Sequence, residues 1–380
     1  MIAAALVIVL TPQDVRVSNA AEFRQAVANA KPGQRILVAP GEYRGGFGFS
    51  GLNGTSERKI VIAGAEPTNR PRFSGIQFSR ISHVEIRDIV IDATTGNGIN
   101  IDDGGSIDQP SHHVLLENVF VLETPKGNID GIKLSGVGDF QVKGCTIERW
   151  GGSGIDMVGC HRGVIEGCTF QNGGDNGVQG KGGTSDVVVR RCLFENAGQR
   201  AVNLGGSTGM QFFRPALAKM PANAKYEAKN LTVEGCIFIG SAAPIAFVGV
   251  NGAVVRFNTI YMPERWAVRI LQETVSPEFV PSRNGVFTDN IVVFRSDKWA
   301  SGGVNVGPNT APQTFRFERN WWYCTDRPAN STPQLSTKET NGTYGTDPQF
   351  VDAANGDLRL KPTSPAQGAG AGALNSALGG

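Results

Sequence analysis

The stretch FQVKGCTIERWGGSGIDMVGCHRGVIEGCTFQNGGDNGVQGKGGTSDVVVRRCLFE, residues 140–195, decides the fold because it repeats one unit. In each unit a short alternating segment leads into a cysteine, and a phrase such as SGIDMV or NGVQGK follows. Cys145, Cys168 and Cys192 stand 23 and 24 residues apart, and the glycine phrases keep the same period. Two signals with one period in one phase indicate a solenoid of stacked coils.

The cysteine position of this unit continues in both directions along the chain, where it alternates with other small polar residues. Aligned in this way, the column is predicted to contain Asp88, Asn118, Cys145, Cys168, Cys192, Cys236, Asn258, Asn290 and Asn320. We expect the thiols to be buried and unbridged, because stacked Cβ vectors run parallel rather than towards each other. Stacked asparagines are expected to hydrogen-bond along the axis.

Short β-branched segments separated by glycine and asparagine turns, without any helix-length pattern between them, predict an all-β chain. We expect a single-stranded right-handed parallel β-helix of about 23 residues per coil, in which each coil serves as its own crossover. It should form one domain over residues 15–380. Residues 18–33 read as a capping helix, with Asn19 as N-cap, Glu22 closing a capping box and Gly33 after the end. Residues 325–380 break the period and should wrap the other end.

The first residues, MIAAALVIVLTPQD, contain an apolar run too short to span a bilayer. We interpret residues 1–14 as a possible signal segment and expect a secreted or periplasmic protein with no stable membrane span. The net charge of +2 argues against nucleic acid as the partner. We also expect the chain to be a monomer.

The outward positions of the glycine phrases carry unlike polar groups, since side chains alternate across a strand. The residue between the two apolar positions forms a column of Asn100, Lys133, Asp156, Gln179, Asn203 and, further on, Arg269. Two positions later stand Asp102 and Lys181, and Asp130, Asn176 and Arg200 precede the glycine position. Insertions border this face: one carries Asp103 and ends in His112 and His113, which we read as loop residues, and the other carries Arg214. A groove so lined suits an acidic, hydroxyl-rich polymer.

Such a polymer can be cleaved by β-elimination, in which a base removes the C5 proton and a cation neutralises the neighbouring carboxylate. Lys181 is the preferred base and Lys133 the second candidate, because lysine serves as a base when burial or cationic neighbours lower its pKa. Arginine pairs with carboxylates in a bidentate fork. We therefore expect Arg200 to take part in catalysis, and the predicted substrate-binding residues are Asp156, Gln179, Asn203, Asn176, Arg269 and Arg214. Alternatively, Ca²⁺ could neutralise the carboxylate, held by Asp102, Asp103 and Asp130.

The sequence resembles the parallel β-helix polysaccharide lyases. Residues 17–45 and 53–65 are similar to the start of the alginate lyase and chondroitinase B family, which implies Lys181 in GVQGKGG as base and an arginine on the next coil. Arg200 stands a few residues before that family's position. DGIKLSG at 130–136 resembles the lysine phrase of the family-nine pectate lyases, which implies Lys133 and a calcium site near IDDGGSID. The closing residues 347–365 resemble those of many exported bacterial β-helix proteins.

Three other functions stay open at this point. A glycoside hydrolase on the same fold would need two carboxylates across the bond, and Asp130 with Asp156 could supply them. The paired-aspartate strand and Gly-His-Gly phrase of β-helix polygalacturonases are missing from the sequence. A C5-epimerase shares the proton abstraction, and a non-catalytic carbohydrate-binding solenoid would use only the groove.

Overall fold

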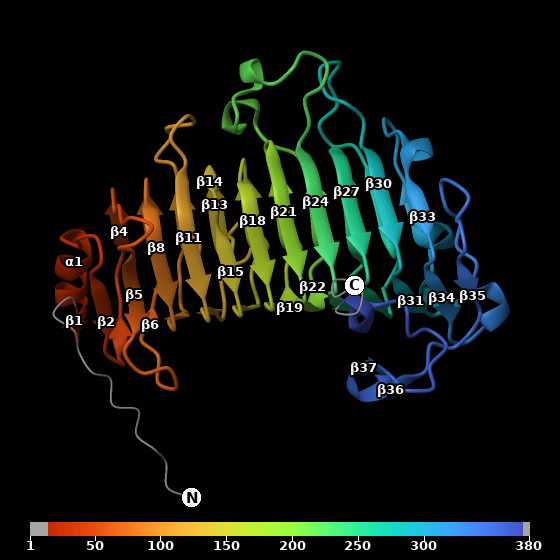
Figure 1. Ribbon diagram of the computed structural model, residues 1–380, viewed down its shortest axis with the longest axis horizontal. Helices are drawn as coiled ribbons and strands as arrows, with labels where there is room; N and C mark the ends of the chain where they lie inside the picture. Colours follow the sequence, from red (N-terminus) through yellow and green to blue (C-terminus); the bar gives the residue numbers. More distant parts are fainter. Residues whose placement is uncertain (1–13, 375–380) are drawn as a thin grey trace, which may run out of the picture.

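The computed structural model describes residues 14–374, so the possible signal segment at 1–14 lies outside the described residues apart from Asp14. The chain winds into a right-handed parallel β-helix whose coils stack side by side along the longest axis (Figure 1). Each full coil contributes one strand to each of three parallel sheets, as expected from the repeat. No helix within residues 14–374 is long and apolar enough to cross a membrane.

The first sheet has 13 strands and forms one long side of the solenoid. Its strands are β1 (Asp14–Val17), β2 (Arg35–Val38), β5 (Ile60–Gly64), β8 (Ser82–Arg87), β11 (Ser111–Glu117), β14 (Val137–Gly138), β15 (Gln141–Lys143), β18 (His161–Glu166), β21 (Thr184–Arg190), β24 (Ala228–Glu234), β27 (Val250–Arg256), β30 (Arg283–Thr288) and β33 (Arg316–Glu318).

The second sheet has 12 strands, most of them shorter than those of the first sheet. They are β3 (Glu42–Tyr43), β6 (Arg72–Phe73), β9 (Val90–Ile91), β12 (Phe120–Val121), β16 (Thr146–Glu148), β19 (Thr169–Gly173), β22 (Leu193–Ala197), β25 (Ile237–Ile239), β28 (Thr259–Tyr261), β31 (Ile291–Phe294), β34 (Trp321–Cys324) and β35 (Thr343–Tyr344).

The third sheet has 10 strands and carries the glycine phrases of the sequence repeat. They are β4 (Phe47–Ser50), β7 (Ile76–Ser79), β10 (Ile99–Asp102), β13 (Ile132–Ser135), β17 (Ser153–Val158), β20 (Asn176–Lys181), β23 (Arg200–Gly205), β26 (Ala243–Val248), β29 (Val268–Leu271) and β32 (Val304–Val306).

The interior is one continuous apolar core, because inward positions of all three sheets stack coil upon coil. In the second sheet, Phe170, Phe194 and Phe238 stack face to face with ring centroids 4.7 and 4.8 Å apart. This matches the spacing of paired strands, about 4.8 Å, so in-register stacking brings identical side chains into contact. Each coil thus buries an apolar surface that it could not bury alone.

The cysteine column is confirmed for Cys145, Cys168, Cys192 and Cys236, which are buried, face the core and form no disulfide. Asn258, Asn290 and Asn320 continue it as an asparagine ladder. The Nδ2 atoms of Asn258 and Asn290 each donate to the Oδ1 atom of the next asparagine at 3.0 Å. Each ladder amide also donates to a buried backbone carbonyl, so no polar atom of these amides lacks a partner among the described residues.

The first two members predicted for this column are wrong by one residue. The inward positions of those coils are Ile89 and Val119, since their neighbours Val90 and Phe120 pair in register with Thr146. Asp88 and Asn118 occupy the preceding left-handed turn position, with φ of +54° and +55°. Gly144 and Gly167 take that position in later coils. Aspartate and asparagine tolerate this conformation better than other side chains, so a polar residue there marks the turn rather than the column.

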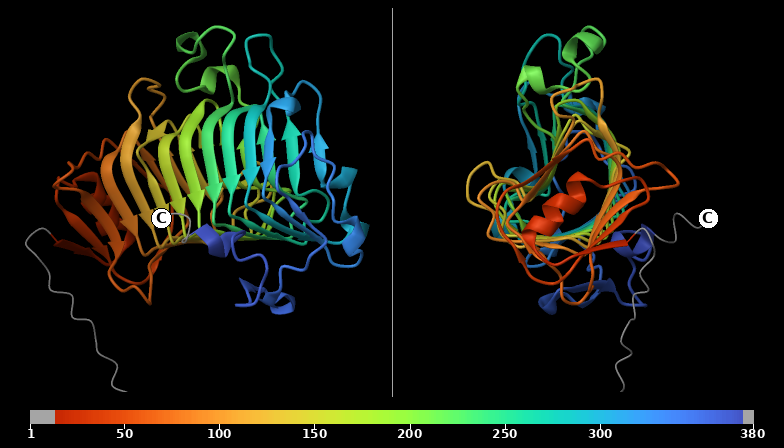
Figure 2. Two further views of the ribbon diagram at one scale, coloured as in Figure 1. Left: turned by 45° about the vertical axis from the view of Figure 1, so that its right-hand side comes forward. Right: turned by 90° about the vertical axis from the view of Figure 1, so that its left-hand side faces the viewer.

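The open end of the first coil is covered by α1 (Ala20–Ala28), as predicted (Figure 2). Phe23 and Val27 of this helix are fully buried against the core. The Asn19 side chain accepts from the backbone N–H groups of Ala21 and Glu22, which confirms it as N-cap. The Glu22 carboxylate accepts from Ser18 rather than from the N-cap backbone, so the expected capping box is displaced by one residue.

Beyond the last coil the chain leaves the repeat, as expected for the C-terminal region. A hairpin of β36 (Phe350–Asp352) and β37 (Asp357–Leu360) projects from the second-sheet side (Figure 1). Ala366 and Ala369 pack against Ile291 and Val293 on the outside of the second sheet. The segment therefore covers an outer face of the solenoid near its C-terminal end.

Candidate active-site groove

The predicted outward column lies on the third sheet in consecutive coils. Neighbouring strands pair in register at Asn100, Lys133, Asp156, Gln179 and Asn203. The same column continues through Ala246 on β26 to Arg269 on β29. Their strand neighbours, for example Ile155 and Met157, belong to the apolar core. The register predicted from the sequence is therefore confirmed.

Two lysines and one aspartate form the centre of this face. The Lys133 ammonium contacts a carboxylate oxygen of Asp156 and lies 3.4 Å from Asp130 Oδ2. Lys181 Nζ lies 3.5 Å from the other oxygen of Asp156 and donates to Gln179 Oε1 at 3.0 Å. Asp156 is thus held between two ammonium groups from the coils on either side of it. The lysine side chains keep 21% and 19% of their surface exposed, whereas Asp156 is buried.

The two lysines differ in their partners, and this difference matters for proton transfer. Burial alone would lower the pKa of Lys133, but the charges of Asp156 and Asp130 outweigh it and raise this pKa above its ordinary value. Lys133 therefore retains its proton. Burial, followed by the charge of Asp156, raises the pKa of the Asp130 carboxyl. Lys181 has one longer ion-pair contact and a neutral amide as its partners.

The loops that follow the third-sheet strands build a wall beside this face. Loops 103–110 and 206–227 both rise from the edge between the third and first sheets (Figure 1). They meet through a buried ion pair, in which Arg214 donates to both oxygens of Asp103 at 2.5 and 2.9 Å. Lys219 and Asp108 form a second, exposed link at 2.5 Å. The two insertions are therefore one joined wall across the intervening coils.

The joined wall explains why the intervening coils turn on glycines. Gly136 and Gly159 have φ of +65° and +61°, and a Cβ atom at either would collide with Arg214. These turns must be both left-handed and free of a side chain, which only glycine provides without strain. The Nε and Nη2 atoms of Arg214 bind Asp103, and its Nη1 atom donates to the Phe212 carbonyl. Arg214 also lines the space between the wall and the sheet, and its binding of substrate stays a prediction. In this structure it holds the wall.

A pocket of about 630 Å³ opens between the wall and the sheet. Lys133 and Lys181 lie on its floor, and residues 207–209 with Phe212 line one side. Phe212 is 51% exposed, which is uncommon for a large aromatic residue, and it was not singled out in the sequence. Its loop has no repeat partner, so no periodic signal could have placed it beside the lysines.

The base of the long loop is fixed by Glu227, which is fully buried. Its carboxylate accepts from the backbone N–H groups of Gly182 and Thr208 and from the hydroxyls of Thr208 and Thr274. Burial raises the pKa of this carboxyl. Glu227 therefore ties the turn after Lys181 to loops 206–227 and 272–282, and it positions the wall relative to the lysine.

A second cationic cluster lies further along the third sheet. Arg200 pairs with Glu273 of loop 272–282 at 2.8 Å and donates to Asn203 Oδ1 at 3.3 Å. Arg269 lies over the Trp266 ring, 4.5 Å from its centroid, and burial followed by the charge of Arg200 lowers the pKa of Arg269. Arg200 and Arg269 thus lie on the same sheet two coils apart, on β23 and β29. Neither lines the lysine pocket.

The remaining predicted binding residues are largely buried within the same face. Asn176 donates to Ser153 Oγ at 3.4 Å, and Gln179 accepts from Lys181. The Nδ2 atom of Asn203 is buried without a hydrogen-bond partner among residues 14–374. Glu273 was missed because loop 272–282 lies outside the repeated phrases. Trp266 was not singled out, although it precedes the glycine position of its phrase as Arg200 does on an earlier coil.

The three aspartates proposed for calcium do not converge. Asp103 is saturated by Arg214, and Asp130 contacts Lys133 and accepts from the Ser153 backbone N–H. Asp102 accepts from Ser79, Asn100 and the backbone of Gly104. Within residues 14–374 no three carboxylates bring their oxygens within ligand distance of one another. The donor set therefore does not fit a calcium ion held by these residues.

Comparison with known proteins supports the fold. Residues 74–214 match the family model described as "Right handed beta helix region". No curated protein sequence matches the chain significantly.

Several solved structures share the architecture at low sequence identity. The polysaccharide lyase Pedsa3628 of the PL6 family from Pseudopedobacter saltans is 13% identical with a TM-score of 0.59, over 94% of this chain and 99% of that one. Pectate lyase Pel9A is 14% identical with a TM-score of 0.53, over 90% and 84% of the two chains. The PL6 family alginate lyase AlyGC is 13% identical with a TM-score of 0.51 over 94% of this chain, which spans only 56% of the AlyGC chain. At these identities the likeness establishes a common fold.

Proposed function

We propose that this right-handed parallel β-helix is a polysaccharide lyase that cleaves a uronate-containing polymer by β-elimination. The observation that carries the proposal is the row Lys133–Asp156–Lys181, which places two lysines on the floor of one pocket. The lyases that share its fold act, by their names, on alginate and pectate. A groove for an acidic polymer agrees with the Arg200 and Arg269 cluster further along the same sheet.

In the proposed reaction Lys181 is the base. Its Nζ atom takes the C5 proton, the C5–H electron pair forms the C4–C5 double bond, and the bond from C4 to the glycosidic oxygen breaks. The proton held by Lys181 returns to the leaving oxygen when both lie on one face of the ring, so that charge and atoms balance. Lys181 suits this role better than Lys133, whose proton is retained by two carboxylates.

Lys133 is proposed to neutralise the substrate carboxylate. Its ammonium lines the pocket together with Lys181, and a fixed positive charge stabilises the negative charge that develops when the C5 proton leaves. Arg269 is then proposed to bind the carboxylate of a neighbouring sugar residue, because guanidinium groups bind carboxylates through two parallel hydrogen bonds. Arg200 would join it by exchanging its contact with Glu273 for the substrate. No step of the proposed reaction uses calcium.

One observation favours a second function, glycoside hydrolysis. Asp130 has a raised pKa and Asp156 lies one coil away, which is the pairing of acid and carboxylate that hydrolases use. Both side chains are nearly inaccessible, at 3% and 1% exposure, and both contact the Lys133 ammonium. We therefore rank hydrolysis below elimination.

The test is a product assay on alginate, pectate and rhamnogalacturonan, each with and without a chelator. New ultraviolet absorbance from unsaturated ends, unaffected by chelator, is the expected result. New reducing ends without that absorbance would favour the hydrolase. Altered uronate composition without chain cleavage would indicate an epimerase. Binding without any chemical change would leave a carbohydrate-binding solenoid. Export of the chain, proposed from its first residues, is tested separately by fractionating the cells that produce it.

A further inference from the structure

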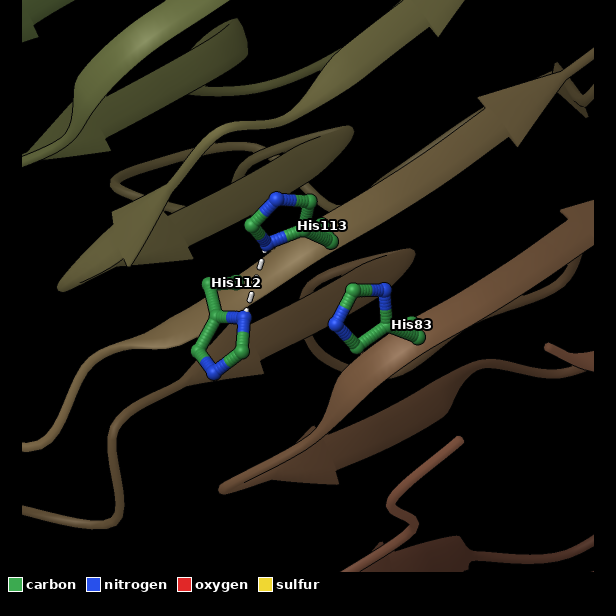
Figure 3. A group of neighbouring side chains, drawn as sticks. All are labelled: His83, His112 and His113. Atoms are coloured by element: carbon green, nitrogen blue, oxygen red, sulfur yellow. Dashed lines mark hydrogen bonds between the residues drawn. The ribbon is translucent and has the colours of Figure 1, made fainter. Parts of the chain in front are cut away.

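Three of the four histidines in the sequence meet on the outer face of the first sheet (Figure 3). None of the three lines the lysine pocket. His83 comes from β8, and His112 and His113 come from the adjacent strand β11. The expectation that His112 and His113 are loop residues was therefore wrong. One nitrogen from each ring can be chosen so that all three lie within 4.8 Å of one another. The Nδ1 atoms of His112 and His113 are 2.9 Å apart.

The backbone explains how two consecutive residues of a strand can face the same side. His83 and His113 both have a left-handed conformation, with φ of +53° and +54°. Between β8 and β11 neither residue has a pairing partner: His112 pairs with Ser82, and the next pair is Val114 with Val84. On β11 the result is a pair of outward residues between buried Ser111 and Val114. The same irregularity in both strands brings the His83 and His113 rings into a stack, with centroids 4.4 Å apart.

The three rings of the cluster lie at the surface: His83 and His112 are partly buried, and His113 is exposed. The charged groups that act on the cluster are few and of both signs: Glu57, Lys59 and Asp139. Asp139 is itself paired with Arg162. Neutral imidazole nitrogens with free lone pairs are good ligands for divalent transition metals.

We propose that His83, His112 and His113 bind one zinc ion, which links strands β8 and β11 across neighbouring coils. Zinc is bound by histidine nitrogens at about 2.0–2.1 Å, so that two ligand nitrogens of a tetrahedral site stand about 3.4 Å apart. One nitrogen from each ring lies within 4.8 Å of the other two, so the rings must rotate towards this spacing when the ion binds. Three protein nitrogens leave the fourth position to water. The site is independent of the proposed lyase reaction.

The decisive experiment is calorimetric titration of the chelator-treated full chain with Zn²⁺ alone. The parent is expected to bind one ion per chain. His83→Asn and His113→Asn remove an imidazole while keeping a residue that tolerates the left-handed backbone. Each should weaken zinc binding by more than the roughly 10- to 100-fold that the loss of an outer-shell partner costs. The matched control is His161→Gln, since His161 is the fourth histidine and contacts Ser185 outside the cluster.

Thermal unfolding separates metal binding from folding. A ligand that binds only the folded state raises the unfolding midpoint. Zinc should therefore raise the midpoint of the parent and of His161→Gln, and should leave both asparagine variants unchanged, while all four proteins unfold at similar temperatures without metal. The proposal is overturned if the parent takes up no stoichiometric zinc, or if His83→Asn and His113→Asn bind zinc as tightly as the parent does.

Discussion

Exchanging each pocket lysine for methionine should separate the base from the neutralising cation, because the structure gives the two lysines different partners. Lys181→Met keeps the alkyl stem and removes the amine. If Lys181 is the base, turnover should fall by at least about a hundredfold, the lower end of what general-base catalysis contributes. Lys133→Met should also reduce turnover, because the substrate carboxylate then lacks its neutralising charge.

Lys133→Met should be less stable than Lys181→Met, because Lys133 has the closer carboxylate contacts. In Lys181→Met, Asp156 keeps its contact with Lys133, and the loss is a longer ion pair and one hydrogen bond. We expect a cost of about 1 kcal/mol. In Lys133→Met, Asp130 loses its cationic partner, and Asp156 keeps only the 3.5 Å contact with Lys181. Removing one partner of a buried pair costs about 3–5 kcal/mol, so this variant should be clearly less stable.

The assay combines initial rates of ultraviolet absorbance on the polymer that the parent cleaves with denaturant midpoints for all three proteins. A stable, inactive Lys181→Met beside a destabilised Lys133→Met is the expected pattern. Near-normal turnover in Lys181→Met would refute its role as base. If Lys181→Met kept near-normal turnover while Lys133→Met were inactive, the base would be Lys133 and the similarity to the family-nine pectate lyases would be the better guide.

Three further outcomes can be measured on the same protein. Phe212→Ala should raise KM about fivefold, which corresponds to about 1 kcal/mol of lost aromatic contact with the substrate. Because Phe212 is half exposed, the unfolding midpoint should not change. An unchanged KM would show that Phe212 is not part of the site. Burial opposes the charges of Asp156 and Asp130 at Lys133, and the charges prevail, so its pKa is raised above the ordinary lysine value. Its stabilising effect should therefore be complete below the pKa of an unfolded lysine and be lost as the pH rises through the raised pKa. Alkaline unfolding curves of Lys133→Met should lack this loss, and identical curves for the two proteins would contradict it. Asn290→Ala should lower the free energy of unfolding by about 3 kcal/mol or more, because it leaves buried backbone groups unpaired. Cys192→Ala in the same column should lower it by only about 1–2 kcal/mol. Equal losses in denaturant unfolding would argue against a stabilising asparagine ladder.

The repeat made most of the fold predictable, because inward and outward positions follow from a strict alternation within each phrase. The outward column from Asn100 to Asn203 could be placed before any coordinates because its period is fixed by strand pairing. The register failed at Asp88 and Asn118, where the same residue types that fill the ladder elsewhere occupy the left-handed turn. The left-handed turn and the buried ladder both favour small polar side chains. Residue type alone therefore does not show which of the two positions a residue occupies.

The site was less predictable because its walls are not periodic. Arg214 and Asp103 are 111 residues apart in sequence and form one ion pair, and no spacing rule connects them. Each had been given a separate role, in substrate or metal binding, on the basis of its charge. In the structure the two side chains pair with each other. The role of a charged residue in an insertion therefore cannot be assigned until the insertion that it contacts is known.

The helix that covers the first coil also has a consequence for the order of assembly. In a solenoid each coil contacts mainly its neighbours, so structure can grow from any formed end by adding one coil at a time. Residues 19–28 leave the ribosome before any complete coil does, and Phe23 and Val27 can shield the apolar end as soon as it forms. Synthesis then leaves one open strand edge, which is the edge that the next coil occupies. We therefore expect the capping helix to give co-translational folding a direction and to shorten the time for which a partly made chain exposes an edge to other chains.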